Sequence, residues 1–363
     1  MKSDPELYRA EGMPVLQNRM FNSQAEALNS ATGDIRLVQD SGSGLIFNRA
    51  FRPELMHYDA DYQNEQSVSA VFKAHLAEAS KVIVRNFPGN ELIEVGCGKA
   101  YFLEHLQSLG FRMLGFDPTY EGSNPNVLRK YFDQESGLHA EGIILRHVLE
   151  HVQDPFGFLG RIRDANGGKG RIYIEVPCFE WICRRRAWFD IFYEHVNYFR
   201  LADFERLFGH VYEMGHAFEG QYLYVVADLS TLRMPQMRPA DRFRFPADFS
   251  STIDQYAGML KRSAAEAGSA AKSAVWGGAS KGVIFALFMQ RAGARIDCVV
   301  DINPAKQGKY LALTGHEVIS PRRAISMLAP GSKVLVMNGN YSAEIRAMTN
   351  NEFNYLVVDD EII

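Results

Sequence analysis

The sequence predicts an α/β protein in which two doubly wound parallel sheets follow a small leading module. Patterns typical of strands and helices alternate twice, over residues 71–230 and again over 273–363. Between them, residues 231–272 hold a connector rich in Pro, Arg and Met and then a long helical pattern. Alternating strands and helices form parallel sheets with helices on both faces. Because 363 residues exceed one ordinary hydrophobic core, we expect two α/β domains behind a small N-terminal module over residues 1–70.

The composition is that of an ordinary globular protein and argues against several functional classes. Apolar residues make up 47% of the chain and the formal net charge is −4, with no basic run that would neutralise a nucleic-acid backbone. No stretch has the length and apolarity of a membrane span, and the N-terminus lacks the apolar segment of a signal peptide. We therefore expect a cytoplasmic monomer or homodimer that acts on a small molecule, with no nucleic-acid or membrane partner.

The cysteines give no sign of a disulfide framework or a zinc module. None of the four forms a CxxC pair: Cys97, Cys178, Cys183 and Cys298. We expect reduced, mostly buried thiols and no bound metal.

The leading module consists of short apolar runs interrupted by Gly, Ser, Asn and Pro. Within it, DIRLVQDSGSGLIFN (residues 34–48) predicts a β-hairpin around the loop 40–44.

The two α/β domains open with the same layout. In the first, the strand ELIEVG, the helix AYFLEHLQSLG and the strand RMLGFDP carry a glycine turn at Gly96 and a terminal acid at Asp117. In the second, SAVWGGASKGVIFALFMQ and IDCVVD carry Gly278 and Asp301 in the same way. An acid about 20 residues beyond a glycine turn is typical of mononucleotide-binding units, in which it binds ribose hydroxyls. One or both domains are therefore candidates for binding a nucleotide.

The first glycine loop, LIEVGCGKAYFL, favours a cationic ligand. Gly96 and Gly98 let the backbone approach a ligand, and the helix that follows offers free amide donors. A pyrophosphate would be repelled by Glu94, whereas the sulfonium and the amino-acid tail of S-adenosylmethionine would not. Asp117, followed by Pro118, would then bind the ribose diol.

Other residues near this loop are candidates for the same ligand. The strand end in GIILRHVLEHVQDP places Arg146 and His147 beyond the carboxyl edge of the sheet, where open α/β sheets bind ligands. Tyr131 and Phe132 could pack on adenine, although an exposed aromatic turn explains them equally well.

Several motifs together resemble a known family. LIEVGCGKAYFLEHL, GFDP and ILRHVLEHVQDP look like the class I S-adenosylmethionine-dependent methyltransferases. EVPCFEWICRRRAWFDIFYEHVNYF, the C-terminal WGGASKGVIFAL and NYSAEI resemble, more narrowly, the bacterial nucleotide-sugar C-methyltransferases. The resemblance implies a Rossmann-like methyltransferase core, a small N-terminal module, a C-terminal Rossmann-like domain and C-methylation of a nucleotide-linked keto-deoxysugar. It also implies that Tyr62, Gln63 and Ser67 lie against the cofactor.

The sequence departs from that family at two places. The family's zinc-ligating cysteines are replaced by the loop Asp40 to Ser43, so we expect no zinc. In the family's run of tyrosine, histidine, glutamate and histidine, Phe192 occupies the tyrosine position and a tyrosine appears at position 193.

The run WFDIFYEHVNYF supplies the candidate catalytic groups because it follows a strand that ends at Pro177, above the expected methyl donor. Methylation of a carbon beside a ketone requires a base for the C–H proton and a donor to the enolate oxygen. His195 is the candidate base, Glu194 its orienting neighbour and Tyr193 a possible donor, with His147 as the second choice of base. An aromatic-flanked histidine in a core is the competing interpretation. Asn197, Tyr198 and Tyr222 are placed near the acceptor, with core packing the stronger interpretation for Tyr198.

The second loop, WGGASKG, lacks a carboxylate and suits phosphate oxygens. Lys281 would act as a point charge on a diphosphate, and Asp301 would bind a ribose or cap the backbone. Two other interpretations stay open, an NAD(P) site that makes the protein an oxidoreductase or nucleotide-sugar-binding protein, and a purely structural lobe. O- or N-methylation of a related nucleotide-linked acceptor is the close alternative to C-methylation.

Overall fold

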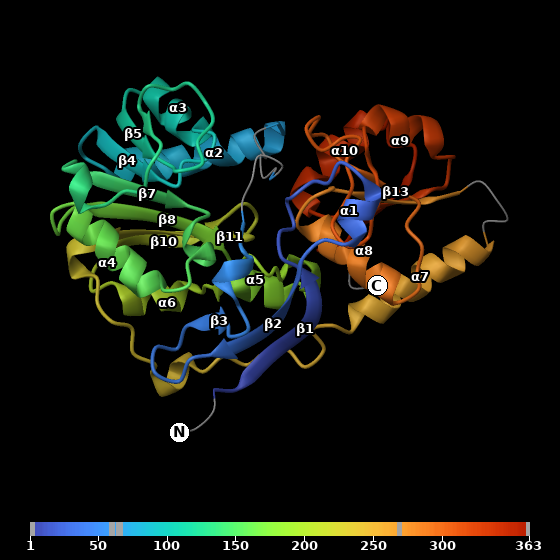
Figure 1. Ribbon diagram of the computed structural model, residues 1–363, viewed down its shortest axis with the longest axis horizontal. Helices are drawn as coiled ribbons and strands as arrows, with labels where there is room; N and C mark the ends of the chain where they lie inside the picture. Colours follow the sequence, from blue (N-terminus) through green and yellow to red (C-terminus); the bar gives the residue numbers. More distant parts are fainter. Residues whose placement is uncertain (1–3, 58–61, 63–67, 267–270, 361–363) are drawn as a thin grey trace.

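The computed structural model of the protein describes residues 4–57, 62, 68–266 and 271–360 and contains three β-sheets (Figure 1). A seven-stranded sheet lies on one side, a five-stranded parallel sheet on the other, and a four-stranded antiparallel sheet of mostly N-terminal strands lies between and below them. Among the described residues, no helix is long and apolar enough to span a bilayer. The three sheets and the helices that pack on them make the chain an α/β protein, as the sequence predicts, with a Rossmann-like core sheet.

The seven-stranded sheet has the order β10-β11-β8-β7-β4-β5-β6. Its strands from β8 to β6 run parallel, whereas β11 is antiparallel to β8 and β10 is antiparallel to β11. The bounds are β4 Glu91–Val95, β5 Arg112–Phe116, β6 Val127–Leu128, β7 Gly142–Arg146, β8 Arg171–Pro177, β10 Val211–Ala217 and β11 Tyr222–Asp228.

Helices cover both faces of this sheet because alternate residues of its strands point to opposite sides. Ile93, Ile143 and Ile172 pack in one hydrophobic cluster with helix α4 (Pro155–Ala165). Their neighbours Leu92, Ile144 and Tyr173 pack in another with helices α2 (Ala70–Asn86) and α3 (Tyr101–Ser108). Both faces are thus buried, which accounts for the nearly continuous apolar runs of these strands.

The C-terminal sheet is wholly parallel, in the order β14-β13-β12-β15-β16. Helices α7 and α8 share a hydrophobic cluster with one face, and α9 and α10 share one with the other. The strands are β12 Ser273–Trp276, β13 Cys298–Val300, β14 Val318–Ile319, β15 Lys333–Val336 and β16 Asn354–Val357. The helices are α7 Thr252–Glu266, α8 Lys281–Arg291, α9 Pro321–Met327 and α10 Ser342–Met348.

The N-terminal sheet has the order β1-β2-β3-β9 and includes a strand from far along the chain. Its strands are β1 Glu6–Pro14, β2 Thr32–Gln39, β3 Ile46–Asn48 and β9 Asn197–Tyr198. The predicted hairpin is confirmed, because β2 and β3 pair antiparallel around the loop from Asp40, where Gly44 has a φ of +75°. Strand β9 pairs with β3, so the run predicted to carry catalysis is also part of this sheet.

The segment between β1 and β2 joins the N-terminal sheet to the C-terminal domain. It contains helix α1 (Gln24–Leu28), which lies beside the C-terminal domain in Figure 1. Phe21 exchanges backbone hydrogen bonds with Tyr310, and the Arg291 guanidinium donates to the carbonyl oxygens of Glu11 and Gly12. These contacts fix the N-terminal module against the C-terminal domain.

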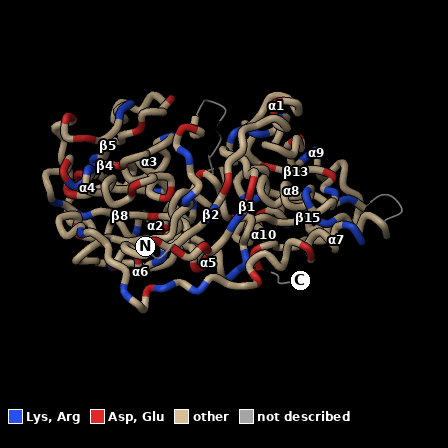
Figure 2. The backbone as a smooth tube through the Cα atoms, turned by 60° about the horizontal axis from the view of Figure 1, so that its bottom comes forward, with Lys and Arg blue, Asp and Glu red and all other residues tan. Residues whose placement is uncertain are grey.

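Charges of both signs are distributed along the whole chain. In Figure 2, acidic and basic positions alternate along the tube and no long segment carries one sign alone. This distribution agrees with the absence of a basic run in the sequence.

Candidate functional site

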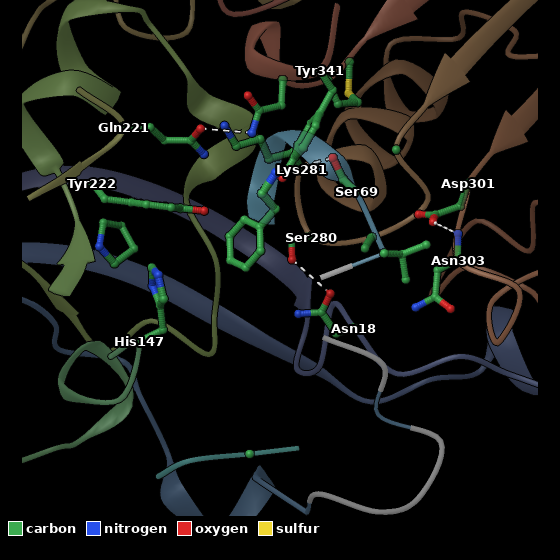
Figure 3. Close-up of a pocket in the computed structure, with 18 of the residues that line it drawn as sticks. Asn18, Ser69, His147, Gln221, Tyr222, Ser280, Lys281, Asp301, Asn303 and Tyr341 are labelled. Atoms are coloured by element: carbon green, nitrogen blue, oxygen red, sulfur yellow. Dashed lines mark hydrogen bonds between the residues drawn. The ribbon is translucent and has the colours of Figure 1, made fainter. Parts of the chain in front are cut away.

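One cavity of about 400 Å³ lies where the carboxyl ends of the parallel strands of the seven-stranded and C-terminal sheets face each other. Residues following β4, β7 and β8 line it on one side, and residues following β12, β13 and β15 line it on the other. Asn18 of the N-terminal segment completes the wall, and its side chain accepts a hydrogen bond from the Ser280 hydroxyl at 3.0 Å (Figure 3). The cavity is thus built from all three parts of the chain, at the strand ends where α/β sheets bind ligands.

The first glycine loop forms part of this cavity. Gly96 and Gly98 both have positive φ angles, +72° and +52°. A β-carbon added at Gly98 would meet no atom within 4 Å, whereas one at Gly96 would lie 2.5 Å from Val148. The loop is therefore closed on its inner side at Gly96 and open toward the cavity at Gly98.

Glu94 is a buried carboxyl group without a partner for one of its oxygens. The residue is 3% exposed and lines the cavity, and its Oε2 atom has no hydrogen-bond partner among the residues that the structure describes. Burial raises the pKa of Glu94 to about 8, against the lowering effect of Arg146. A cationic group entering the cavity would meet this oxygen and favour the ionised carboxylate.

The residues predicted to hold the ribose and adenine lie outside the lining of the cavity. Asp117 Oδ2 accepts a hydrogen bond of 2.8 Å from the Gly98 amide, and Oδ1 accepts from the amide and hydroxyl of Thr119. Pro118 is exposed and Tyr131 is 73% exposed, while Phe132 is buried against Phe116. Asp117 thus braces the glycine loop, and the aromatic pair does not form the expected adenine wall in this structure.

Glu175, on β8, is the electrostatic centre beneath the cavity. Its Oε1 atom accepts from Arg146 at 2.7 Å and lies 3.1 Å from a ring nitrogen of both His75 and His147. Burial alone would raise the pKa of Glu175, but Arg146 and the two histidines hold it well below its usual range. Its Oε2 atom accepts from the Tyr173 hydroxyl at 2.7 Å, so both oxygens of this carboxylate have partners within the protein.

His147 is an imidazolium in this environment. Its Nε2 faces Glu175, and its Nδ1 lies 3.4 Å from the carboxylate of Glu150. Burial would lower the pKa of His147, but the hydrogen bonds and charges of these two carboxylates raise it to about 9. The expectation that His147 serves as a reserve base therefore does not fit the structure, because a protonated imidazole donates protons.

Glu194 and His195 both line the cavity. The stretch before β9 is a 3-10 turn, η4 (Trp188–Asp190), followed by irregular backbone, so consecutive side chains are not forced to opposite faces as in a strand. Glu194 accepts from the Gln17 amide at 2.7 Å and from the Tyr62 hydroxyl at 2.6 Å. Burial raises the pKa of Glu194. Its two oxygens thus tie the N-terminal segment to the cavity wall.

His195 is a neutral imidazole surrounded by aromatic rings and another histidine. Its ring centroid lies 4.8 Å from Phe192 and 5.0 Å from His151. Burial and the charge of His151 lower the pKa of His195 to about 3. A neutral ring can accept a proton or bind through its lone pair, and the Glu150 carboxylate nearby favours its protonated form.

Tyr193 points away from the cavity, into the N-terminal module. Its side chain is fully buried against Phe51, and its hydroxyl group accepts from the Arg52 amide at 2.9 Å. A β-carbon at Gly33 would lie 2.2 Å from its ring. The predicted role of Tyr193 as a donor to the acceptor is therefore contradicted by the direction of its side chain.

Of the three further acceptor candidates, only Tyr222 lines the cavity, next to His147 in Figure 3. The Asn197 amide donates to the carbonyl oxygens of Leu149 and Val152, and therefore holds the turn that carries His151. The Tyr198 hydroxyl exchanges hydrogen bonds with the backbone of Phe192. Asn197 and Tyr198 are structural braces, as the packing interpretation of Tyr198 anticipated.

Lys281 lines the C-terminal side of the cavity, where its charge is balanced by two carboxylates. Its Nζ atom lies 3.1 Å from Asp190 Oδ2 and 4.0 Å from Asp359 Oδ2, and it sits over the ring of Trp181. Burial raises the pKa of both Asp190 and Asp359. Lys281 is therefore not the isolated positive charge that a diphosphate site requires, in contrast to the expectation from the glycine loop.

Asp301 repeats the role that Asp117 has in the first domain. Its Oδ2 atom accepts from the Gly278 amide at 2.9 Å and its Oδ1 atom accepts from the Asn303 amide (Figure 3). Lys306 approaches the same carboxylate, with Nζ at 3.4 Å from Oδ2. Unlike Asp117, Asp301 lines the cavity, so a ligand can reach it.

Several groups in the cavity were not predicted from the sequence, and two of the predicted cofactor contacts lie outside the described residues. Gln63 and Ser67 lie outside the described residues, and their neighbour Tyr62 lines the cavity. The missed cavity residues include Glu150, Asp190, Gln221, Asn338 and Glu344. Glu150 had a readable signal, because it precedes His151 in a motif already singled out, whereas Asp190 was hidden inside the aromatic run.

The comparisons with known proteins concern the first α/β domain. Residues 63–211 match the family described as "Methyltransferase domain". The comparison with curated proteins found no match.

Several solved structures resemble part of the chain. A SAM-dependent methyltransferase from Archaeoglobus fulgidus is 16% identical over 43% of this chain and 93% of its own, with a TM-score of 0.33. The N-methyltransferase NodS from Bradyrhizobium japonicum WM9 is 15% identical over 44% of this chain and 97% of its own, with a TM-score of 0.33. A SAM-dependent methyltransferase from Aquifex aeolicus is 13% identical over 45% and 96%, with a TM-score of 0.35. Given the methyltransferase domain over residues 63–211, the protein is an S-adenosylmethionine-dependent methyltransferase, and S-adenosylmethionine is its cofactor.

Proposed function

We propose that the protein transfers the methyl group of S-adenosylmethionine to a carbon beside the ketone of a nucleotide-linked keto-deoxysugar. The observation that carries this proposal is the shared cavity, in which an unpaired buried carboxylate on the methyltransferase side faces a second set of strand ends. The cavity can therefore receive a methyl donor from one domain and hold a long acceptor against the other.

The cofactor fits the first half of the cavity. The orphaned Oε2 atom of Glu94 offers an acceptor for the ammonium group of the amino-acid tail, and the open side of Gly98 leaves room for the ligand backbone. When bound, the cofactor supplies an electrophilic methyl group on sulfur. Asp117 would take the ribose diol only in addition to its bond from Gly98, which a carboxylate oxygen with two lone pairs allows.

We propose that His195 removes the proton from the acceptor carbon. Its ring is neutral and lines the cavity, and the Glu150 carboxylate beside it would stabilise the imidazolium that forms. His147, which is protonated, and the hydroxyl of Tyr222 are the available donors to the developing enolate oxygen. A base of this kind contributes a factor of roughly 10²–10⁴ in rate.

The second half of the cavity supports an acceptor that extends beyond the reacting sugar. Asp301, Asn303 and Lys306 line it at the end of β13, at the edge where ribose hydroxyls bind in nucleotide-binding sheets. Lys306, whose Nζ lies 3.4 Å from Asp301 Oδ2, is the cation that we propose to contact a phosphate of such an acceptor. O- or N-methylation of a related nucleotide-linked acceptor is the second candidate, because the same cavity fits it.

Methyl transfer from cofactor labelled with ¹³C in the methyl group tests the proposal directly. The purified protein is incubated with nucleoside-diphosphate-linked keto-deoxysugars, and the product is examined by NMR. A signal from a methyl group bonded to carbon is the expected result, whereas a methyl group bonded to oxygen or nitrogen identifies the second candidate.

Proton exchange in D₂O without methyl donor tests the base. We expect deuterium at the carbon beside the ketone, and a loss of roughly 10²–10⁴ in the exchange rate for His195→Ala. Exchange that is as fast in this variant as in the wild type would remove His195 from the role. The variant His210→Ala changes a histidine outside the cavity and serves as the control.

A further inference from the structure

Three potential metal ligands converge on the methyltransferase side of the cavity, where they follow strands β7 and β8. One donor atom each from Glu150, His151 and His195 can be chosen so that all three atoms lie within 4.8 Å of one another. Two donors on opposite sides of one ion are about 4.2 Å apart for bonds of about 2.1 Å, so small side-chain rotations bring the three atoms around a single centre. All three residues line the cavity.

Glu150 has an oxygen that nothing in the described protein satisfies. Its side chain is 2% exposed, and its Oε2 atom has no hydrogen-bond partner, while the other oxygen faces His147 Nδ1 at 3.4 Å. Leaving a buried carboxylate oxygen without a partner is unfavourable, so its position in a ligand cavity indicates a partner that binds from the cavity.

The hydrogen bonds of His151 leave its other nitrogen free for a cation. Its Nδ1 lies 3.0 Å from the carbonyl oxygen of Glu194, which can only accept a hydrogen bond. The proton is therefore on Nδ1, and the lone pair of Nε2 is available. Metal-binding histidines typically donate their second ring nitrogen to a backbone carbonyl or a carboxylate in this way.

The outer contacts of the cluster are also those of a supported site. Glu150 is held by His147, and His147 is held by Glu175 at 3.1 Å. The carbonyl that fixes His151 belongs to Glu194, whose own carboxylate is tied to Tyr62 and to the Gln17 amide. Two of the three ligands, Glu150 and His151, are thus held by residues outside the ligand set.

We propose that Glu150, His151 and His195 form a binding site for one divalent first-row transition-metal ion on the methyltransferase side of the cavity. Two imidazoles and one carboxylate on one side of an ion leave coordination positions open. Because those positions face the cavity, the ion would bind an acceptor that presents two neighbouring oxygens, such as a ketone beside a hydroxyl group. The sequence-based expectation of no metal considered only cysteine ligands, both along the chain and in the leading module.

This inference rests on the proposed function, which puts the acceptor in this cavity. It changes the role of His195 from base to metal ligand. A histidine whose lone pair binds an ion cannot take up a proton, so in the loaded protein the proton of the acceptor carbon would pass to solvent water instead of His195, and the cation would lower the cost of its loss by polarising the acceptor oxygen. The substrate class narrows accordingly to acceptors with adjacent oxygens.

Titration with Co²⁺ alone, followed by its electronic absorption spectrum, tests the site in protein that has been freed of metal with EDTA and dialysed. We expect one strong site per chain in the wild type. Glu150→Gln, His151→Gln and His195→Gln should each weaken Co²⁺ binding by more than the roughly 10–100-fold that loss of an outer contact costs. Calorimetric binding of S-adenosylhomocysteine, measured on every variant, shows that each is folded.

His216→Gln is the matched control, because His216 belongs to the other potential donor group, with Cys178 and Glu180. Unchanged Co²⁺ binding in this variant is expected. A wild type without a one-to-one site, or a site that survives all three cavity substitutions, overturns the inference. If the metal-free protein transfers methyl groups to carbon as fast as the loaded protein, the inference fails while the proposed function stands. If Co²⁺ binds but no acceptor is methylated, the proposed function fails while the metal site stands.

Discussion

Cofactor binding should release a proton from Glu94, because the buried carboxyl group lacks a partner for Oε2 until a cation arrives. The perturbation is a change of pH, compared between the wild type and Glu94→Gln. Burial holds the pKa of Glu94 at about 8 in the free protein, so the group is mostly neutral at pH 7. The ammonium group of the ligand favours the ionised form, and ligand binding must therefore supply the free energy of ionisation.

The size of this effect follows from the pKa. At one pH unit below a pKa of about 8, ionising Glu94 costs about 1.4 kcal/mol, which corresponds to a tenfold loss of affinity. The affinity for S-adenosylhomocysteine should therefore rise about tenfold between pH 6 and pH 7, less between pH 7 and pH 8, and then level off. The effect of pH on the stability of the free protein has the opposite sign. Because the pKa of Glu94 in the folded protein lies above the usual 4.5, Glu94 lowers the free energy of unfolding as the pH rises from 4.5 to about 8.

Isothermal titration calorimetry measures both quantities. The heat of binding in buffers of different ionisation enthalpy gives the number of protons released, which should approach one near pH 6.5. Glu94→Gln should bind with an affinity that is nearly independent of pH and release no proton. Glu104→Gln, an exposed change on the helix after the loop, is the control and should behave as the wild type. Equal pH slopes for the wild type and Glu94→Gln, or no proton release by the wild type, would refute this account.

Three further predictions concern stability. Gly33→Ala places a methyl group 2.2 Å from the ring of Tyr193 and should lower the free energy of unfolding in urea by about 1–3 kcal/mol. Gly160→Ala, in open space on α4, is the control and should raise the free energy of unfolding by about 0.5–1 kcal/mol. An unchanged free energy of unfolding for Gly33→Ala would contradict the packing of Tyr193 against Gly33. The hydrogen bond from Arg85 lowers the pKa of Glu213 to about 2 from 4.5, so this pair stabilises the fold above pH 4.5 and the stabilisation is lost as the pH falls toward 2. Because Arg85 is half exposed, we expect only about 1 kcal/mol, and Glu213→Gln should remove the pH dependence of that amount in acid unfolding curves. S-adenosylhomocysteine at 100 times its dissociation constant should stabilise the folded protein by about 2.7 kcal/mol and thereby raise its melting temperature. The rise should be smaller in Glu94→Gln. An unchanged melting temperature in the wild type would contradict binding to the folded state.

The fold was largely predictable because its signals are local. Glycine turns at Gly96 and Gly278, each followed by a helix and by a strand ending in Asp, indicated both parallel sheets, and the structure repeats even the hydrogen bond from the glycine loop to the acid. The hairpin from β2 to β3 was visible for the same reason. The pairing of β9 with β3 was not visible, because it joins residues about 150 positions apart and has no local signature.

The candidate site was predictable in its location but not in its protonation states or side-chain directions. A strand ending at Pro177 correctly brought the aromatic run to the cavity, yet no periodicity indicated that Tyr193 turns toward the N-terminal sheet. His147 and His195 look alike in the sequence, but two carboxylates raise the pKa of one and burial lowers the pKa of the other. Lys281 looked like a free charge suited to a phosphate, because its ion-pair partner Asp190 lies 91 positions earlier in the chain and has no local signal.

The N-terminal segment has a consequence for the choice of acceptor. Through Glu194 and Ser280, the stretch around Gln17 and Asn18 is attached to both walls of the cavity, and so holds apart the two rows of strand ends. Under the proposed function, we expect an acceptor that fills this space to extend from the methyl donor to Asp301, and a shorter one to lose the contacts at Asp301. We therefore expect the length of a substrate, and not only the chemistry of its reacting end, to decide whether it is positioned for the reaction.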